Sequence, residues 1–257
     1  MRRLLSADIF RILHSRWLWL GLGGMLAMSV GFIVMQLTAM DYTVPLSRVI
    51  FLPMSFYGVV VAALVSLFVG EDFSCGFIRN KIIAGRSRFD IFASNLLACC
   101  LACILIYLAA TIFTALIGSL LFESDISALE FFSCLLLGVG MCVAYVSIYC
   151  SITLLSGNKS TAVVLCMGLA FFMLFACLHT NQVMVQSEYK DGLLNPAYVD
   201  GFAKSVYALL HDLNPSGQAA QLSAMDIFDP LRCLLCDLVW IFAAGAASVL
   251  FRGKNIN

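Results

Sequence analysis

The residues that could carry chemistry in this 257-residue chain are few and widely separated. Asp237 is an acidic residue within a long apolar run, and Arg232 lies near the start of the same run. An ionisable side chain at membrane depth is costly and therefore marks a candidate substrate or ion path. Asp237 and Arg232 are accordingly intramembrane polar candidates, and the alternative is a buried polar contact with another helix or subunit.

Fragments that resemble catalytic motifs do not have the required spacing. The fragment GNKST at 157–161 resembles the end of a P-loop, but Asn158 stands before Lys159 where that loop requires glycine. His14, His179 and His211 are scattered, without metal-binding spacing. We therefore expect no catalytic residue, cofactor or metal in this chain, and we expect that the chain is not itself an enzyme.

The chain has 11 cysteines, and all except Cys75 lie in apolar runs. Two CxxC pairs, Cys100/Cys103 and Cys233/Cys236, could each occupy one face of a helix. Neither pair has a cluster of histidines or carboxylates beside it, so both are interpreted as small apolar helix residues, and a metal or redox site is the alternative. No segment expected outside the membrane suggests a disulfide framework.

The composition predicts an all-α integral membrane protein. Hydrophobic residues make up 62% of the chain and charged residues only 12%, with a mean hydropathy of +0.98. A soluble domain of this size keeps a larger polar exterior, whereas about 20 apolar residues form one membrane-crossing helix. The formal net charge of zero gives no sign of a nucleic-acid partner. We predict one transmembrane domain over residues 1–257, with spans at 17–39, 49–69, 91–121, 131–155, 161–180 and 231–251.

Lysine and arginine are distributed unequally between the two sides that these spans define. With the N-terminus inside, the inner segments hold Arg2, Arg3, Arg11, Arg16, Arg79, Lys81, Arg86, Arg88, Lys159, Arg252 and Lys254, and the outer segments hold Arg48, Lys190 and Lys204. Because cytoplasmic segments are enriched in basic residues, the sequence predicts a multi-pass plasma-membrane protein with both termini in the cytoplasm.

Three segments outside the spans have patterns of their own. Residues 1–16 mix arginine with leucine and isoleucine, which predicts an amphipathic helix on the inner surface. Residues 181–230 form the large outer segment, interrupted by Gly192, Pro196, Gly201, Pro215 and Gly217. Its apolar spacing predicts two short interfacial helices that are separated at 214–215.

The inner loop at 71–90 carries the most informative pattern. We predict a short amphipathic helix with Asp72 in its first turn and Gly85 at its end. Phe73, Phe77 and Ile78 would form its apolar edge, and Arg79, Asn80 and Lys81 would point elsewhere. Ser87 and Asp90 then match a capping box that starts the third span. The segment is either an ordinary basic loop or a docking element for a cytoplasmic partner.

The stretch EDFSCGFIRNKIIAGRSRFDIFASNLL resembles the cytoplasmic loop of the permeases of type-2 ABC transporters. The matching positions are Glu71, Gly76, Ile78, Arg79, Asn80, Gly85, Ser87 and Arg88. The chain departs from the family at Phe77, where Thr is typical, and at Arg86, where Pro is frequent. The sequence LLHDLNPSGQAAQL is also similar to the family's Pro-x-Gly-Gln region before the last span.

The resemblance implies a permease of the bacteriocin- or drug-export-like kind, without a nucleotide site of its own. Residues 1–16 would be its elbow helix and 71–90 its coupling loop, onto which a separate ATPase docks through Glu71, Asp72, Phe73, Gly76, Phe77, Ile78 and Arg79. A second permease subunit, as a homo- or heterodimer, would complete the pathway, with spans one, two and five lining it. The substrate would be an amphiphilic peptide, drug or lipid-like molecule.

The sequence is also consistent with two further hypotheses. A secondary transporter or channel that uses Asp237 is the alternative to the ABC permease. Gly23, Ala27 and Gly31 recur every four residues in the first span, and small residues also cluster at 243–248. Both patterns are typical of close helix contacts, either within one chain or across a dimer.

Overall fold

Helices make up most of the described chain, and six of them in these residues are long and apolar enough to cross a bilayer. The computed structural model describes residues 2–39, 44–190, 193–195 and 198–253, so that Gly192, Pro196 and Lys254 lie outside it. The α-helices are α1 Arg2–Leu13, α2 Arg16–Ala39, α3 Tyr57–Ser74, α4 Phe77–Ile83, α5 Arg88–Leu121, α6 Ala128–Ser156, α7 Lys159–Met184, α8 Gly201–Leu213, α9 Pro215–Ala224 and α10 Pro230–Gly253. The prediction of a helical membrane protein with six spans is confirmed.

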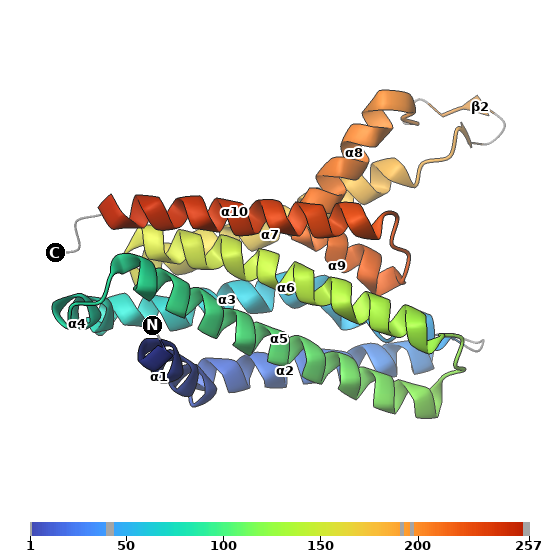
Figure 1. Cartoon of the computed structure of the whole chain (residues 1–257). Coiled ribbons are helices and arrows are strands. Elements are labelled where there is room, and N and C mark those ends of the chain that lie inside the picture. Colours follow the sequence, from blue (N-terminus) through green and yellow to red (C-terminus); the bar gives the residue numbers. More distant parts are fainter. Residues whose placement is uncertain (1, 40–43, 191–192, 196–197, 254–257) are drawn as a thin grey trace.

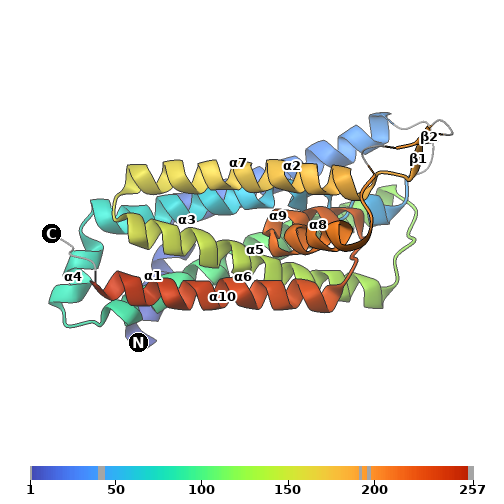
Figure 2. The same cartoon turned by 90° about the horizontal axis from the view of Figure 1, so that it is seen from above.

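The six long helices run along one common axis (Figures 1 and 2). Helix α6 lies among the others and contacts α3, α5, α7, α9 and α10. Helix α1 runs across the common axis near the start of α2, and α4 lies at the same end of the bundle as α1 and the last turns of α10 (Figure 1). At the opposite end α8 leans away from the bundle, beside two-residue strands β1 Tyr189–Lys190 and β2 Leu193–Leu194.

The second span differs from the predicted single helix over 49–69. Its first part consists of two 3₁₀ segments, η1 Leu46–Arg48 and η2 Leu52–Phe56, and α3 begins only at Tyr57. Pro53 lacks a backbone N–H, and Phe51 and Met54 are fully buried where α9 packs against η2. Tertiary packing thus replaces the regular helix there, and α3 continues to Ser74, beyond its predicted end.

Glycine and tyrosine residues hold α3, α5 and α6 close together. The Tyr145 ring lies against Gly58 and the Tyr107 hydroxyl against Gly138, so that a methyl group at either glycine would collide with the ring or hydroxyl. The hydroxyl of buried Tyr57 donates to the carbonyl of Cys103 at 2.7 Å. Because that backbone already belongs to a helix, the hydroxyl is satisfied at membrane depth without another polar side chain.

The predicted break at 214–215 is confirmed, but α9 is not interfacial. The Asn214 side chain accepts from the Ser216 N–H at 3.0 Å and caps α9, whose first helical residue is Pro215. Most of α9 from Pro215 to Leu222 is buried, and the helix contacts α6 and α7. The chain therefore folds back into the bundle after α8. The composition of α9, poor in large apolar residues, did not indicate this position.

Candidate functional site

The junction between α3 and α4 is built on a glycine. Gly76 has φ +71°, a left-handed conformation that other residues adopt only with strain, and it lets the chain turn between the two helices. The next turn is at Gly85, with φ +78°, and Ser87 then caps α5 by accepting from the Asp90 N–H at 3.0 Å. A short helix ending before Gly85 is thus confirmed. The prediction that Asp72 lies in the first turn of this helix is wrong, because Asp72 lies in the last turn of α3.

Two buried carboxylates meet two cations beside this junction, in a group that we call the Asp8–Asp72 cluster. Arg11 of α1 forms a two-pronged ion pair with Asp72, one contact of which measures 3.0 Å. The Lys81 Nζ lies 2.7 Å from Asp8 Oδ1 and 3.3 Å from Asp72 Oδ2. Ser94 of α5 donates to Asp8 Oδ2 at 2.6 Å. The cluster therefore joins α1, α3, α4 and α5.

Because the Asp8–Asp72 cluster is buried, its ion pairs are strong, and its carboxylates need their cationic partners. Asp72 is 0% exposed and Asp8 2%, so that neither carboxylate could remain charged without its partners. The Arg11 guanidinium lies 4.5 Å from the centre of the Phe68 ring, a cation–π contact. A helix of seven residues such as α4 is not stable alone, so its conformation depends on these ion pairs and on buried Ile78.

Glu71 forms a second polar node, which we call the Glu71 node. Its Oε1 accepts from Trp17 Nε1 at 2.9 Å and from Lys159 Nζ at 3.3 Å, and Arg16 lies 3.7 Å away. The node links α2, α3 and α7. The fragment GNKST is therefore a helix–helix turn, in which Gly157 ends α6 with φ +69° and Lys159 binds Glu71.

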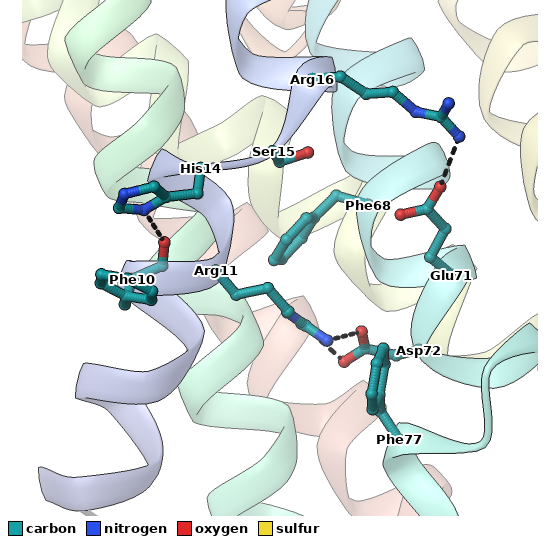
Figure 3. A pocket seen from close by; sticks show the side chains of 9 residues that line it. All are labelled: Phe10, Arg11, His14, Ser15, Arg16, Phe68, Glu71, Asp72 and Phe77. Carbon is teal, nitrogen blue, oxygen red and sulfur yellow. Dashed lines mark hydrogen bonds and ion pairs between the residues drawn. The ribbon is translucent and has the colours of Figure 1, made fainter.

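An open recess of about 430 Å³ lies between these two polar groups, where α1 meets the ends of α3 and α4 (Figure 3). Arg11 and Asp72 face each other at its lower side in the figure, below Phe68, and Arg16 reaches Glu71 at its upper side (Figure 3). Its lining is Phe10, Arg11, His14, Ser15, Arg16, Phe68, Glu71, Asp72 and Phe77.

The predicted docking residues do not form one exposed surface. Asp72 and Ile78 are buried within the chain, Phe73 is partly buried, and Phe77 is 42% exposed. The prediction that Phe73, Phe77 and Ile78 form one apolar edge is therefore wrong. The reason is the turn at Gly76, which places Phe73 on α3 and the other two on a separate helix.

The prediction that Lys81 points outward with Arg79 and Asn80 is also wrong. Its ammonium group points into the Asp8–Asp72 cluster. The outer face of α4 consists instead of Phe77, Arg79, Asn80 and Ile83, and Ile83 is 75% exposed. Sequence reasoning missed Ile83 because the helix was expected to begin near Asp72. Helical spacing counted from Phe77 would have placed Ile83 with Phe77 and Asn80 on one face.

The two intramembrane polar candidates are not paired with each other. Asp237 is 3% exposed and lies against Gly140 of α6, and neither of its carboxylate oxygens has a hydrogen-bond partner among the described residues. Arg232 forms an ion pair with Asp212 of α8, and Gln221 of α9 donates to the same carboxylate at 2.6 Å. Arg232 thus ties α10 to α8, and Asp237 remains a separate candidate.

His211 occupies the neighbouring position on α8 and is also buried. Its Nδ1 lies 2.8 Å from the Thr180 hydroxyl of α7. Burial lowers the pKa of His211 from its ordinary value, although the Asp212 carboxylate acts in the opposite direction. His211 and Asp212 together hold α8 to α7, α9 and α10 at this end of the bundle.

No protein-family model and no curated protein matches the chain. The fold defines a multi-pass helical membrane protein, with six candidate spans in its described part. Its site joins a short projecting helix to three neighbouring helices through buried ion pairs.

Proposed function

We propose that this chain is the membrane-spanning subunit of a type-2 ABC transporter and that a separate ATPase docks on residues 71–85. The observation that carries the proposal is the contrast between the two faces of α4. One face is fixed by Ile78 and Lys81, and the other presents Phe77, Arg79 and Ile83 to solvent. Figure 1 shows α4 at the end of the bundle. An ordinary basic loop needs neither a buried anchor nor an exposed apolar surface.

The ion pairs supply a route by which movement of α4 would reach the membrane. Lys81 contacts the acids of α1 and α3, and Asp8 is bound in turn to Ser94 of α5. A force on α4 would therefore move these helices together. A partner that contacts α4 differently in its ATP-bound and ATP-free states would bias the bundle between two arrangements.

The docking residues divide into two groups under this proposal. Phe77, Arg79, Asn80 and Ile83 would contact the ATPase, since they are exposed on α4. Asp72 and Ile78 would hold α4 in place, since both are buried. Gly76 would set the angle of α4 through its left-handed backbone.

The chain would lie in a plasma membrane with the α4 end of the bundle in the cytoplasm. Its substrate would be an exported amphiphilic peptide, drug or lipid-like molecule. Helices α1 and α4, the turn before α5 and the start of α7 lie at one end of the bundle (Figure 1). These segments contain Arg79, Arg86 and Lys159, and the positive-inside rule therefore assigns this end to the cytoplasm. A second permease subunit would pack on α2, where Gly23 and Gly31 have no atom of another part of the described chain within 4 Å of an added Cβ.

Site-specific photocrosslinking in native membranes tests the proposal. A photoreactive phenylalanine analogue at position 83 of the full chain is expected to crosslink to a protein whose sequence contains P-loop and other ATPase motifs. The same analogue at Leu129, which is 79% exposed in the first turn of α6, is the matched control and is expected not to do so. Helix α6 begins at the end of the bundle opposite α4 (Figure 1). Equal capture of the same protein from both positions, or no nucleotide-binding protein from position 83, would contradict the proposal.

The second candidate function is a secondary transporter or channel that uses Asp237. The observation in its favour is the burial of both carboxylate oxygens without a hydrogen-bond partner among the described residues. Purified chain in proteoliposomes would then conduct protons or cations without ATP, and Asp237→Asn would abolish the flux. Asp226→Asn, at an exposed site, is the control. Absence of flux in the wild-type chain would exclude this function.

A further inference from the structure

Two hollows of different character lie next to each other at the start of α2, one lined by Arg16 and the other by Trp17. The recess of about 430 Å³ contains the charged side chains Arg11, Arg16, Glu71 and Asp72. A groove of about 300 Å³ between α2 and α3 begins at Trp17 and is otherwise apolar. Its remaining lining is Leu20, Gly21, Val59, Val60, Ala63, Leu64 and Leu67. Arg16 lines the recess and Trp17, the next residue, lines the groove, and the Arg16 guanidinium lies 4.8 Å from the centre of the Trp17 ring.

The charges around the recess leave a surplus cation at this point. Asp8 and Asp72 are matched by Arg11 and Lys81 in the Asp8–Asp72 cluster. Glu71, in contrast, faces two cations, Arg16 and Lys159. Arg16 makes the longer of the two contacts, at 3.7 Å, and its side chain is 75% exposed. Its guanidinium therefore keeps donors that can bind an additional anion.

We propose that the recess and the groove together bind one phospholipid, with its phosphate at Arg16 and an acyl chain along α2 and α3. The single negative charge of a phosphodiester equals the surplus positive charge. The order of the two hollows, from the charged end of the bundle toward its apolar middle, matches the order of headgroup and chain in a bilayer. Phe10, which is 65% exposed on α1 at the recess, would lie at the boundary between the headgroups and the acyl chains.

The apolar groove is the reason for choosing a lipid instead of free phosphate. A soluble anion would use Arg16 alone, whereas a phospholipid also covers the apolar surface of Leu20, Val60 and Leu67, which are exposed or partly exposed in the groove. The proposal requires only that the chain lies in a membrane. It does not depend on an ATPase partner, and the two proposals can fail separately.

Lipid binding to the purified full-length chain in uncharged detergent tests the inference. Native mass spectrometry would measure the Kd for phosphatidylglycerol, for diacylglycerol, which lacks the phosphate, and for glycerophosphoglycerol, which lacks the chains. Arg16→Gln removes the cation and Ala63→Trp fills the groove, with Ala63→Leu as a milder second variant. Arg86→Gln and Val164→Trp are matched controls at exposed positions away from both hollows.

We expect Arg16→Gln to weaken phosphatidylglycerol binding about tenfold, as loss of a charge-assisted contact does. Ala63→Trp or Ala63→Leu should weaken it also, and the two controls should bind as the wild type does. Diacylglycerol and glycerophosphoglycerol should bind at least tenfold more weakly than the intact lipid. Equal binding by Arg16→Gln and Arg86→Gln would overturn the inference. A Kd for glycerophosphoglycerol equal to that for phosphatidylglycerol would likewise overturn it and indicate a site for a free anion.

Discussion

Replacement of Asp72 by Asn keeps the size of the side chain but removes the charge that Arg11 and Lys81 share. Asp72 is fully buried, and its carboxylate takes two contacts from Arg11 and one from Lys81. In Asp72→Asn these two cations have only Asp8 as a charged partner within the Asp8–Asp72 cluster. The substitution therefore tests whether the cluster holds α4.

The expected cost follows from the exposure of the two cations. Loss of one partner of a buried ion pair costs about 3–5 kcal/mol, because the remaining charge stays buried. Here the Arg11 side chain is 29% exposed and that of Lys81 14%, so that water can partly compensate both. We expect a loss of about 2–3 kcal/mol in the free energy of unfolding.

Two measurements on the purified chain check this expectation. Reversible unfolding in mixed micelles of increasing dodecyl sulfate content, followed by circular dichroism, gives the free energy. Hydrogen exchange of the backbone amides of α4 reports whether this short helix loosens first. Asp226→Asn is the matched control at an exposed acid, with an expected change below about 0.5 kcal/mol.

A double-mutant cycle decides between a specific ion pair and a general effect of charge. The cost of Asp72→Asn with Arg11→Met should fall short of the sum of the single costs by about 1–3 kcal/mol. A coupling near zero would contradict a specific ion pair between Arg11 and Asp72. A cost of Asp72→Asn no larger than that of Asp226→Asn, or unchanged hydrogen exchange in α4, would show that the cluster does not hold α4.

Three further predictions concern single residues. Gly76→Ala places a Cβ on a residue with φ +71° in open space, so that we expect a loss of about 1 kcal/mol from backbone strain alone, measured by thermal unfolding, whereas Gly24→Ala in α2 should be neutral or stabilising. Gly140→Ala would press its Cβ against the Asp237 carboxylate and should cost about 1–3 kcal/mol in the same assay, with Gly168→Ala, where an added Cβ meets no atom of another described part of the chain within 4 Å, as the control. His211 is held neutral because burial lowers its pKa, so its contribution is present above the ordinary pKa of about 6.5 and is lost as the pH falls from there through the lower pKa of the folded protein. The unfolding midpoint should therefore drop more between pH 7.5 and 5.5 in the wild type than in His211→Gln, and equal drops would contradict the role of His211.

The helical membrane architecture could be predicted from the sequence because hydropathy is a local property. A run of about 20 apolar residues must satisfy its own backbone groups in hydrocarbon, and it does so as a helix wherever it lies in the chain. Turn positions such as Gly85 and the cap Ser87 were also local and were predicted correctly. The 3₁₀ start of the second span was not predicted, because this conformation depends on packing against α9.

The site could be located from the sequence but not assembled from it. The basic, glycine-bounded stretch at 70–88 identified the place, since composition and turn residues are visible along the chain. The partners of its acids are distant in sequence: Asp8 and Arg11 lie on α1, Ser94 on α5 and Lys159 on α7. Only the packing of these helices decides that Asp72 and Lys81 point inward and Ile83 outward. The physical reason is that helix formation depends on neighbours within a few residues, whereas burial and charge pairing depend on which helices meet.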